Sequence, residues 1–150
     1  MKKYVLLMLL MTFTLTLAAC KSEEEKIQTY LKNKSEIVSH FSVVDFTEGE
    51  LNIEIMMMLP DETETVYEDA KKSEASREAK TSLEAIKNYS KKHKGVIKEV
   101  NLYFITRKTN TIVAEVNAKN DTILETDWKD VSEQELFQIA DDYKFHGVSN

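Results

Sequence analysis

The stretch Leu51-Asn-Ile-Glu-Ile-Met-Met-Met-Leu59 decides the fold of this chain of 150 residues. Apolar side chains stand at every second position from Leu51 to Leu59, which is the period of a β-strand with one buried face. The segment Thr47-Glu-Gly-Glu50 precedes the strand and predicts a tight turn, with Gly49 supplying the bend. Val44 and Phe46 alternate on the other side of this turn. The sequence therefore predicts a β-hairpin.

Helical periodicity flanks the hairpin on both sides. Before it, apolar residues from Ile27 to Phe41 follow the three-to-four spacing of one helix face, and Ser22 is the expected N-cap. After it, a polar loop over 61–68 leads to a second helical pattern over 72–93. Gly95 stands where that second helix is expected to stop.

Two further strands and a last helix are expected in the second half of the chain. Alternating apolar residues predict strands over 96–106 and 111–118, with Ile112, Ala114 and Val116 on the core face. The segment 122–128 is either a short strand or a segment that wraps the sheet. Ser132-Glu-Gln-Glu135 fits a capping box, and the helix that it opens is expected to bury Tyr143 in its last turn.

These elements predict an α+β domain in the order α-β-β-α-β-β-α. We expect an antiparallel sheet of about four strands with helices packed on one face. Residues 26–150 are long enough for a single domain of this kind with its own core.

The N-terminus carries the pattern of an export signal. Lys2 and Lys3 are followed by an uncharged stretch over 4–19 that is shorter than the usual bilayer-spanning helix of about 20 residues. It ends in Leu17-Ala18-Ala19-Cys20, which resembles the lipobox of bacterial lipoproteins. The resemblance implies a signal peptide over 1–19, cleavage between Ala19 and Cys20, and a diacylglyceryl group on the Cys20 thiol. Residues 20–25 would then form a lipidated tether.

Cysteine content agrees with a lipidated thiol. Cys20 is the only cysteine, so an intramolecular disulfide is excluded, and a lipid thioether would occupy a thiol that is otherwise unpaired. Two acyl chains anchor a protein far better than one. We therefore expect the domain to lie on the extracytoplasmic face of a cell membrane. The bias toward lysine, with Arg77 and Arg107 as the only arginines, points to a Gram-positive host.

The charge balance argues against nucleic acid as a partner. The whole chain has a formal charge of −6, and removal of Lys2 and Lys3 with the signal peptide lowers it to −8. A surface with this net charge repels phosphate backbones.

The sequence offers no pattern for catalysis, a cofactor or a metal. His40, His93 and His146 are too far apart for a metal-binding motif, although Asp141 and Asp142 precede His146 closely. No serine lies in a glycine-rich turn, and three glycines cannot build a phosphate-binding loop. We expect a protein that is not an enzyme.

Four apolar residues are candidates for an interface: Met56, Met58, Tyr103 and Ile105. They fall on strand faces opposite the best core residues, and methionine and tyrosine are frequent at adaptable binding surfaces. The other interpretation is that a helix or the segment 122–128 covers them. Trp128 likewise has two interpretations: it is either a core residue or an interface anchor.

Together these observations predict a lipid-anchored extracytoplasmic lipoprotein that binds another envelope or membrane protein. An accessory, inhibitory, immunity-type or exclusion-type role fits equally well. One alternative is a small-ligand-binding lipoprotein with a pocket between sheet and helices. The second alternative is a weak hydrolase that uses carboxylates, which requires a cleft with a strongly perturbed Asp or Glu.

Overall fold

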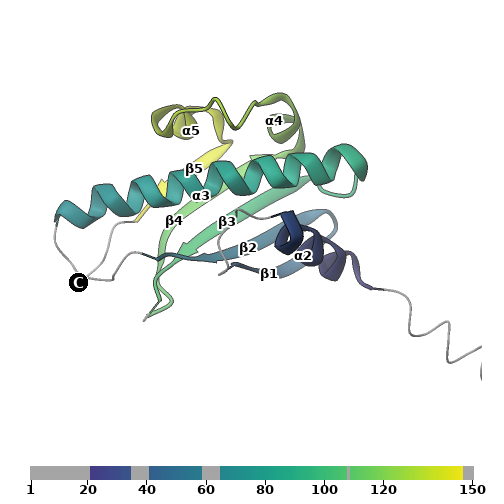
Figure 1. Cartoon of the computed structure of the whole chain (residues 1–150), viewed down its shortest axis with the longest axis horizontal. Helices are drawn as coiled ribbons and strands as arrows, with labels where there is room; N and C mark the ends of the chain where they lie inside the picture. The colour runs from purple at the N-terminus through teal and green to yellow at the C-terminus, as the bar shows by residue number, and fades with distance from the viewer. Residues whose placement is uncertain (1–20, 35–40, 59–64, 108, 147–150) are drawn as a thin grey trace, which may run out of the picture.

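The computed structural model describes residues 21–34, 41–58, 65–107 and 109–146, and they form an α+β fold (Figure 1). Their elements are, in chain order, α2 (Glu23–Lys34), β1 (Phe41–Thr47), β2 (Glu50–Met56), α3 (Thr65–Lys92), β3 (Glu99–Ile105), β4 (Ile112–Lys119), α4 (Asn120–Glu125), α5 (Glu133–Ile139) and β5 (Asp142–Phe145). The five strands make one sheet in the order β1-β2-β3-β4-β5. Within these ranges, none of the helices combines the length and the apolar character needed to cross a bilayer.

The expected hairpin is confirmed. β1 and β2 pair antiparallel around a two-residue turn in which Glu48 and Gly49 both have positive φ angles, 54° and 96°. This is the turn geometry that matches the twist of hairpin strands. Leu51, Ile53 and Ile55 are each at most 1% exposed, as the alternation predicted.

A β-bulge in β1 changes which of its residues face the core. The register shifts between Val43 and Asp45, so Val44 is the extra residue. Val43 therefore takes the buried position, and Val44, which was expected to alternate with Phe46, is 52% exposed.

The prediction of a purely antiparallel sheet is wrong, because β2 and β3 pair parallel from Glu50↔Glu99 to Met56↔Ile105. α3 connects them as a crossover of 28 residues, and at about 1.5 Å per residue it is about 42 Å long. A helix of that length returns the chain to the end of the sheet where β2 began, so the next strand runs in the same direction. α3 also begins at Thr65, inside the segment expected to be a loop.

The last part of the chain differs most from the expectation. Ser132 and Glu135 form the predicted capping box, with Glu135 N–H donating to Ser132 Oγ (3.3 Å) and Ser132 N–H donating to Glu135 Oε2 (2.8 Å). The helix ends at Ile139, however, and Tyr143 lies instead on a fifth strand, opposite Val116 of β4. The segment 122–128 was expected to be a short strand or to wrap the sheet. It is not a strand, because it contains most of α4 and the start of a turn.

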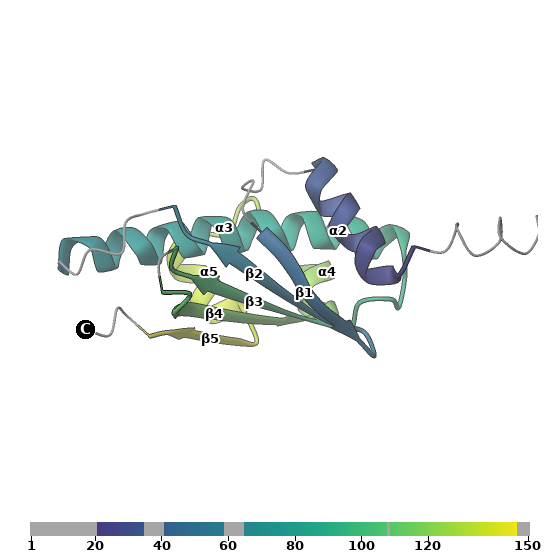
Figure 2. The same cartoon turned by 90° about the horizontal axis from the view of Figure 1, so that it is seen from below.

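The helices lie together on one side of the sheet, as expected. α2 contacts β1, α4 contacts β4, and α2, α4 and α5 all contact α3. The core lies between this layer and the sheet. Ala75, Ala79 and Leu83 of α3 are fully buried there, and small alanines let the helix approach the strands closely. Figure 2 shows the sheet from its other side, with α4 and α5 behind it and α2 beside β1.

Trp128 is a core residue. It is 1% exposed, and its indole N–H donates to the backbone oxygen of Ile123 at 3.0 Å. This bond satisfies its only polar group, so Trp128 closes the core beneath α4 and is not an interface anchor.

Candidate binding surfaces

The side of the sheet that faces away from the helices is the first candidate surface. By strand alternation it carries Asn52, Glu54 and Met56 from β2 and Asn101, Tyr103 and Ile105 from β3. No described helix lies on this side (Figure 2). We call it the open sheet face.

One end of the open sheet face is apolar. Met56 pairs with Ile105, and Ile105 pairs with Ile112, so three apolar residues cross β2, β3 and β4 in one row. A bulge between Phe104 and Ile105 places Ile112 here and not on the core face where the alternation had put it, and Ile112 is 39% exposed. Tyr103 stands in the next row.

The four residues predicted to form an interface are not equally accessible. Met58, just beyond β2, is 47% exposed, and Met56 and Tyr103 are half-buried. Ile105 is only 7% exposed. The structure therefore brings Met56, Tyr103 and Ile105 together on one face, with Ile105 as the packed centre of the apolar row and Met58 at its margin. The backbone N–H of Met58 donates to Glu74 Oε1 of α3 at 2.7 Å, which holds this margin in place.

The rest of the open sheet face is polar and acidic. Three asparagines, Asn52, Asn101 and Asn117, stand side by side across β2, β3 and β4. Asn101 Nδ2 donates to Asn52 Oδ1 (3.0 Å), and Asn117 Nδ2 donates to Asn101 Oδ1 (2.7 Å). Asn101 also donates to Glu50 and Asn117 to Glu99. Such a ladder fixes the polar side chains against one another, so the face presents a defined pattern of acceptors.

The β5 edge of this face carries one ion pair and one contact between a histidine and a carboxylate. Lys144 Nζ lies 2.9 Å from Asp142 Oδ2, and His146 Nε2 lies 2.6 Å from Glu115 Oε1. The hydrogen bond from Lys144 lowers the pKa of Asp142. Burial raises the pKa of Tyr103, and the nearby carboxylates of Glu115 and Glu50 act in the same direction. Asp142 is therefore ionised and Tyr103 neutral at neutral pH.

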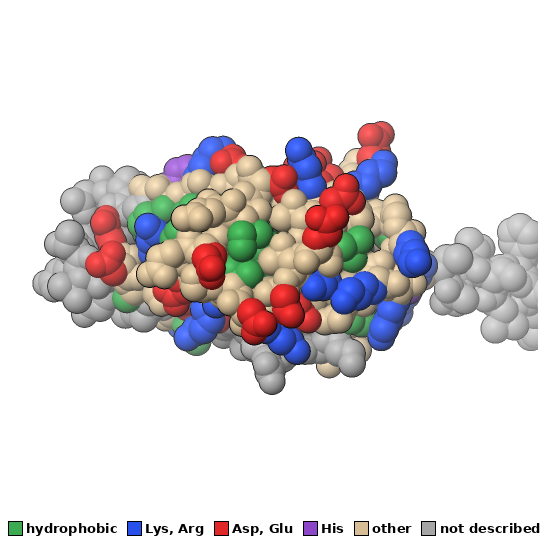
Figure 3. All heavy atoms as spheres, turned by 90° about the horizontal axis from the view of Figure 1, so that it is seen from above, with side chains coloured by type: hydrophobic (Ala, Val, Ile, Leu, Met, Phe, Trp, Pro, Cys, Tyr) green, Lys and Arg blue, Asp and Glu red, His purple; other side chains and the backbone are tan. Residues whose placement is uncertain are grey.

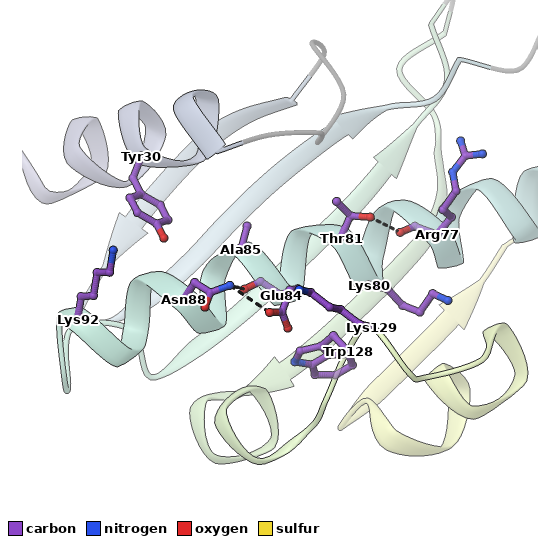
Figure 4. A pocket seen from close by; sticks show the side chains of 10 residues that line it. All are labelled: Tyr30, Arg77, Lys80, Thr81, Glu84, Ala85, Asn88, Lys92, Trp128 and Lys129. Atoms are coloured by element: carbon purple, nitrogen blue, oxygen red, sulfur yellow. Dashed lines mark hydrogen bonds between the residues drawn. The ribbon is translucent and has the colours of Figure 1, made fainter.

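The second candidate surface was not found from the sequence. It is a hollow of about 520 Å³ on the outer side of α3, between α2 and the segment that joins α4 to α5 (Figure 4). Its lining residues come from these three parts of the chain: Tyr30 from α2; Arg77, Lys80, Thr81, Glu84, Ala85, Asn88 and Lys92 from α3; and Trp128 and Lys129 after α4. We call it the α3 groove.

The α3 groove is basic although the chain as a whole is acidic. Four of its lining residues are cations, and Glu84 is the one carboxylate among them. Lys80 Nζ donates to the backbone oxygen of Val131 (2.8 Å), and Lys92 Nζ lies 5.9 Å from the centre of the Tyr30 ring. Around the groove, the helical side of the molecule shows only small apolar patches separated by charged and polar surface (Figure 3).

The expected cleavage and lipidation residues, Ala19 and Cys20, lie outside the described residues. Within the described ranges, no three His, Cys, Asp or Glu side chains gather in a way that would hold a metal ion. No protein-family model matches the chain, and no curated protein or solved structure shows significant similarity to it.

Proposed function

We propose that this chain is a lipid-anchored extracytoplasmic domain that binds another envelope or membrane protein. The lipobox-like Leu17-Ala18-Ala19-Cys20 supports the anchor. The tether expected over 20–25 overlaps α2, which begins at Glu23, so only two residues separate Cys20 from this helix. A tether this short keeps the domain close to the membrane surface and raises its effective concentration for partners in the same membrane.

The observation that carries the binding role is the apolar row on the open sheet face. Met56, Ile105 and Ile112 interrupt an otherwise polar face, and Met58 and Tyr103 border them. Apolar side chains surrounded by polar ones are typical of a protein interface with a dry centre and a hydrated rim. The asparagine ladder beside the row supplies hydrogen-bonding groups for such a rim.

The two alternative functions receive less support. A small-ligand-binding protein would need a pocket between the sheet and the helices. In the described part, the residues between them are almost fully buried, and the α3 groove lies on the outer side of α3. Burial raises the pKa of Glu78, as a catalytic acid would need, but Glu78 does not line the α3 groove. Protein binding is therefore the function that the geometry favours.

Site-specific photo-cross-linking in intact cells tests this proposal. A photoreactive residue at Met58, on the margin of the apolar row, is expected to give an adduct with one membrane protein. The same residue at Gln134, exposed on α5 on the helical side, is the matched control and is expected to give none. Absence of an adduct from Met58, or an identical adduct from Gln134, would contradict the assignment of the open sheet face.

A further inference from the structure

The floor of the α3 groove is a stripe of residues along one side of a helix. Arg77, Lys80, Glu84, Asn88 and Lys92 follow one another at intervals of three or four residues, which places them on one face of α3. Arg77 and Lys92 are 15 residues apart, so the stripe is about 22 Å long at about 1.5 Å per residue. α2 borders it on one side and the Trp128–Lys129 segment on the other (Figure 4). This shape suits an elongated ligand.

Cations stand at both ends of the stripe. Lys92 lies at the α2 end, and Arg77 and Lys80 lie at the other end (Figure 4). Among the described residues, Lys80, Lys92 and Lys129 form no ion pair with a carboxylate, and Arg77 pairs with Glu78 while it remains 68% exposed. These charges can therefore meet an anionic ligand, which a chain of net negative charge would otherwise repel.

The middle of the groove carries a carboxylate, Glu84, in place of cations. Asn88 Nδ2 donates to Glu84 Oε1 at 3.1 Å, which fixes the carboxylate in place. Glu84 Oε2 is shielded from solvent and has no hydrogen-bond partner among the described residues. The Glu84 carboxylate adds negative charge at the middle of the groove, so a ligand with uncharged groups at this point is favoured. A continuous polyanion would place another negative charge there and would be disfavoured.

We infer that the α3 groove binds an acidic polypeptide segment, with carboxylates at both ends and uncharged residues in the middle. The carboxylates meet Arg77 and Lys80 at one end and Lys92 at the other, and the uncharged middle of the segment lies beside Glu84. This inference rests on the proposed protein-binding role, because the segment belongs to a partner, but it concerns a different surface from the open sheet face.

Binding of a designed peptide tests the inference. The protein is the mature lipidated chain in detergent, and the probe is a fluorescent peptide of about 15 residues, long enough to span the groove when extended. It carries glutamates at both ends and alanine and glutamine in the middle. Binding is measured by anisotropy at low and at physiological salt. The Arg77→Gln/Lys92→Gln double variant is expected to weaken binding about tenfold, since it removes an exposed charge at each end of the stripe. Lys144→Gln, on the open sheet face, is the matched control and is expected to leave binding unchanged.

Two further probes separate the alternatives. The same peptide with glutamine in place of glutamate is expected not to bind. Polyphosphate is expected to bind more weakly than the acidic peptide, because of Glu84. No peptide binding, equal loss in the Lys144→Gln control, or tighter binding of polyphosphate would each overturn the inference. These outcomes leave the cross-link from Met58 unaffected, so a failure here is distinguishable from a failure of the proposed function.

Discussion

Ile105 and Met58 provide a matched test of how far the open sheet face is accessible. Ile105→Ala and Met58→Ala each remove three heavy atoms, but Ile105 is 7% exposed and Met58 is 47% exposed. Three buried carbon groups at about 0.8 kcal/mol each, with an added cavity cost, give about 3 kcal/mol for Ile105→Ala. Met58→Ala leaves no enclosed cavity and loses only partly buried surface, so about 1 kcal/mol or less is expected.

Urea unfolding followed by circular dichroism measures both changes. With a slope of about 1.5 kcal/mol/M, the midpoint falls by about 2 M for Ile105→Ala and by about 0.7 M or less for Met58→Ala. The slope itself is expected to stay constant. Equal losses in the two variants would mean that Met58 is covered in the intact protein, and the open sheet face would then lose its most accessible apolar residue.

Three other substitutions test separate parts of the fold by the same unfolding assay. Ser132→Ala removes the α5 cap and is expected to cost about 1 kcal/mol. Gly49→Ala is expected to cost about 1–3 kcal/mol, since its φ is +96° and a Cβ would lie 2.9 Å from Lys98 Cγ. Burial raises the pKa of Glu78, so its ionisation destabilises the fold as pH rises above the ordinary carboxyl range. Glu78→Gln should therefore raise the urea midpoint at pH 7 and leave it unchanged at pH 4.

The features that sequence predicted correctly are those encoded by neighbouring residues. The turn at Glu48 and Gly49 depends on two adjacent backbone conformations, and the capping box joins Ser132 to a residue three positions away. The Ser22 cap is of the same kind, with Glu25 N–H donating to Ser22 Oγ at 3.1 Å. Such short-range contacts can be predicted from a single sequence because the residues that make the contact also form the pattern.

The features that were missed depend on contacts between distant segments. Alternation along β3 identifies its buried face but carries no information on strand direction, so the parallel pairing with β2 was not predictable from it. Tyr143 fits a helical stripe by spacing, yet pairing with Val116 places it on a strand. The stripe from Arg77 to Lys92 was visible at helical spacing, but the groove also needs Tyr30 and Lys129, which only the fold brings beside it.

The intact mass of the protein extracted from membranes tests the central claim most directly. The lipid-anchored account predicts a chain that begins at Cys20, with the added mass of a thioether-linked diacylglyceryl group. It also predicts that Cys20→Ser abolishes this mass and releases the protein or leaves an uncleaved precursor. A mature wild-type chain that begins at Cys20 without added lipid, or one cleaved at another position, would contradict the account.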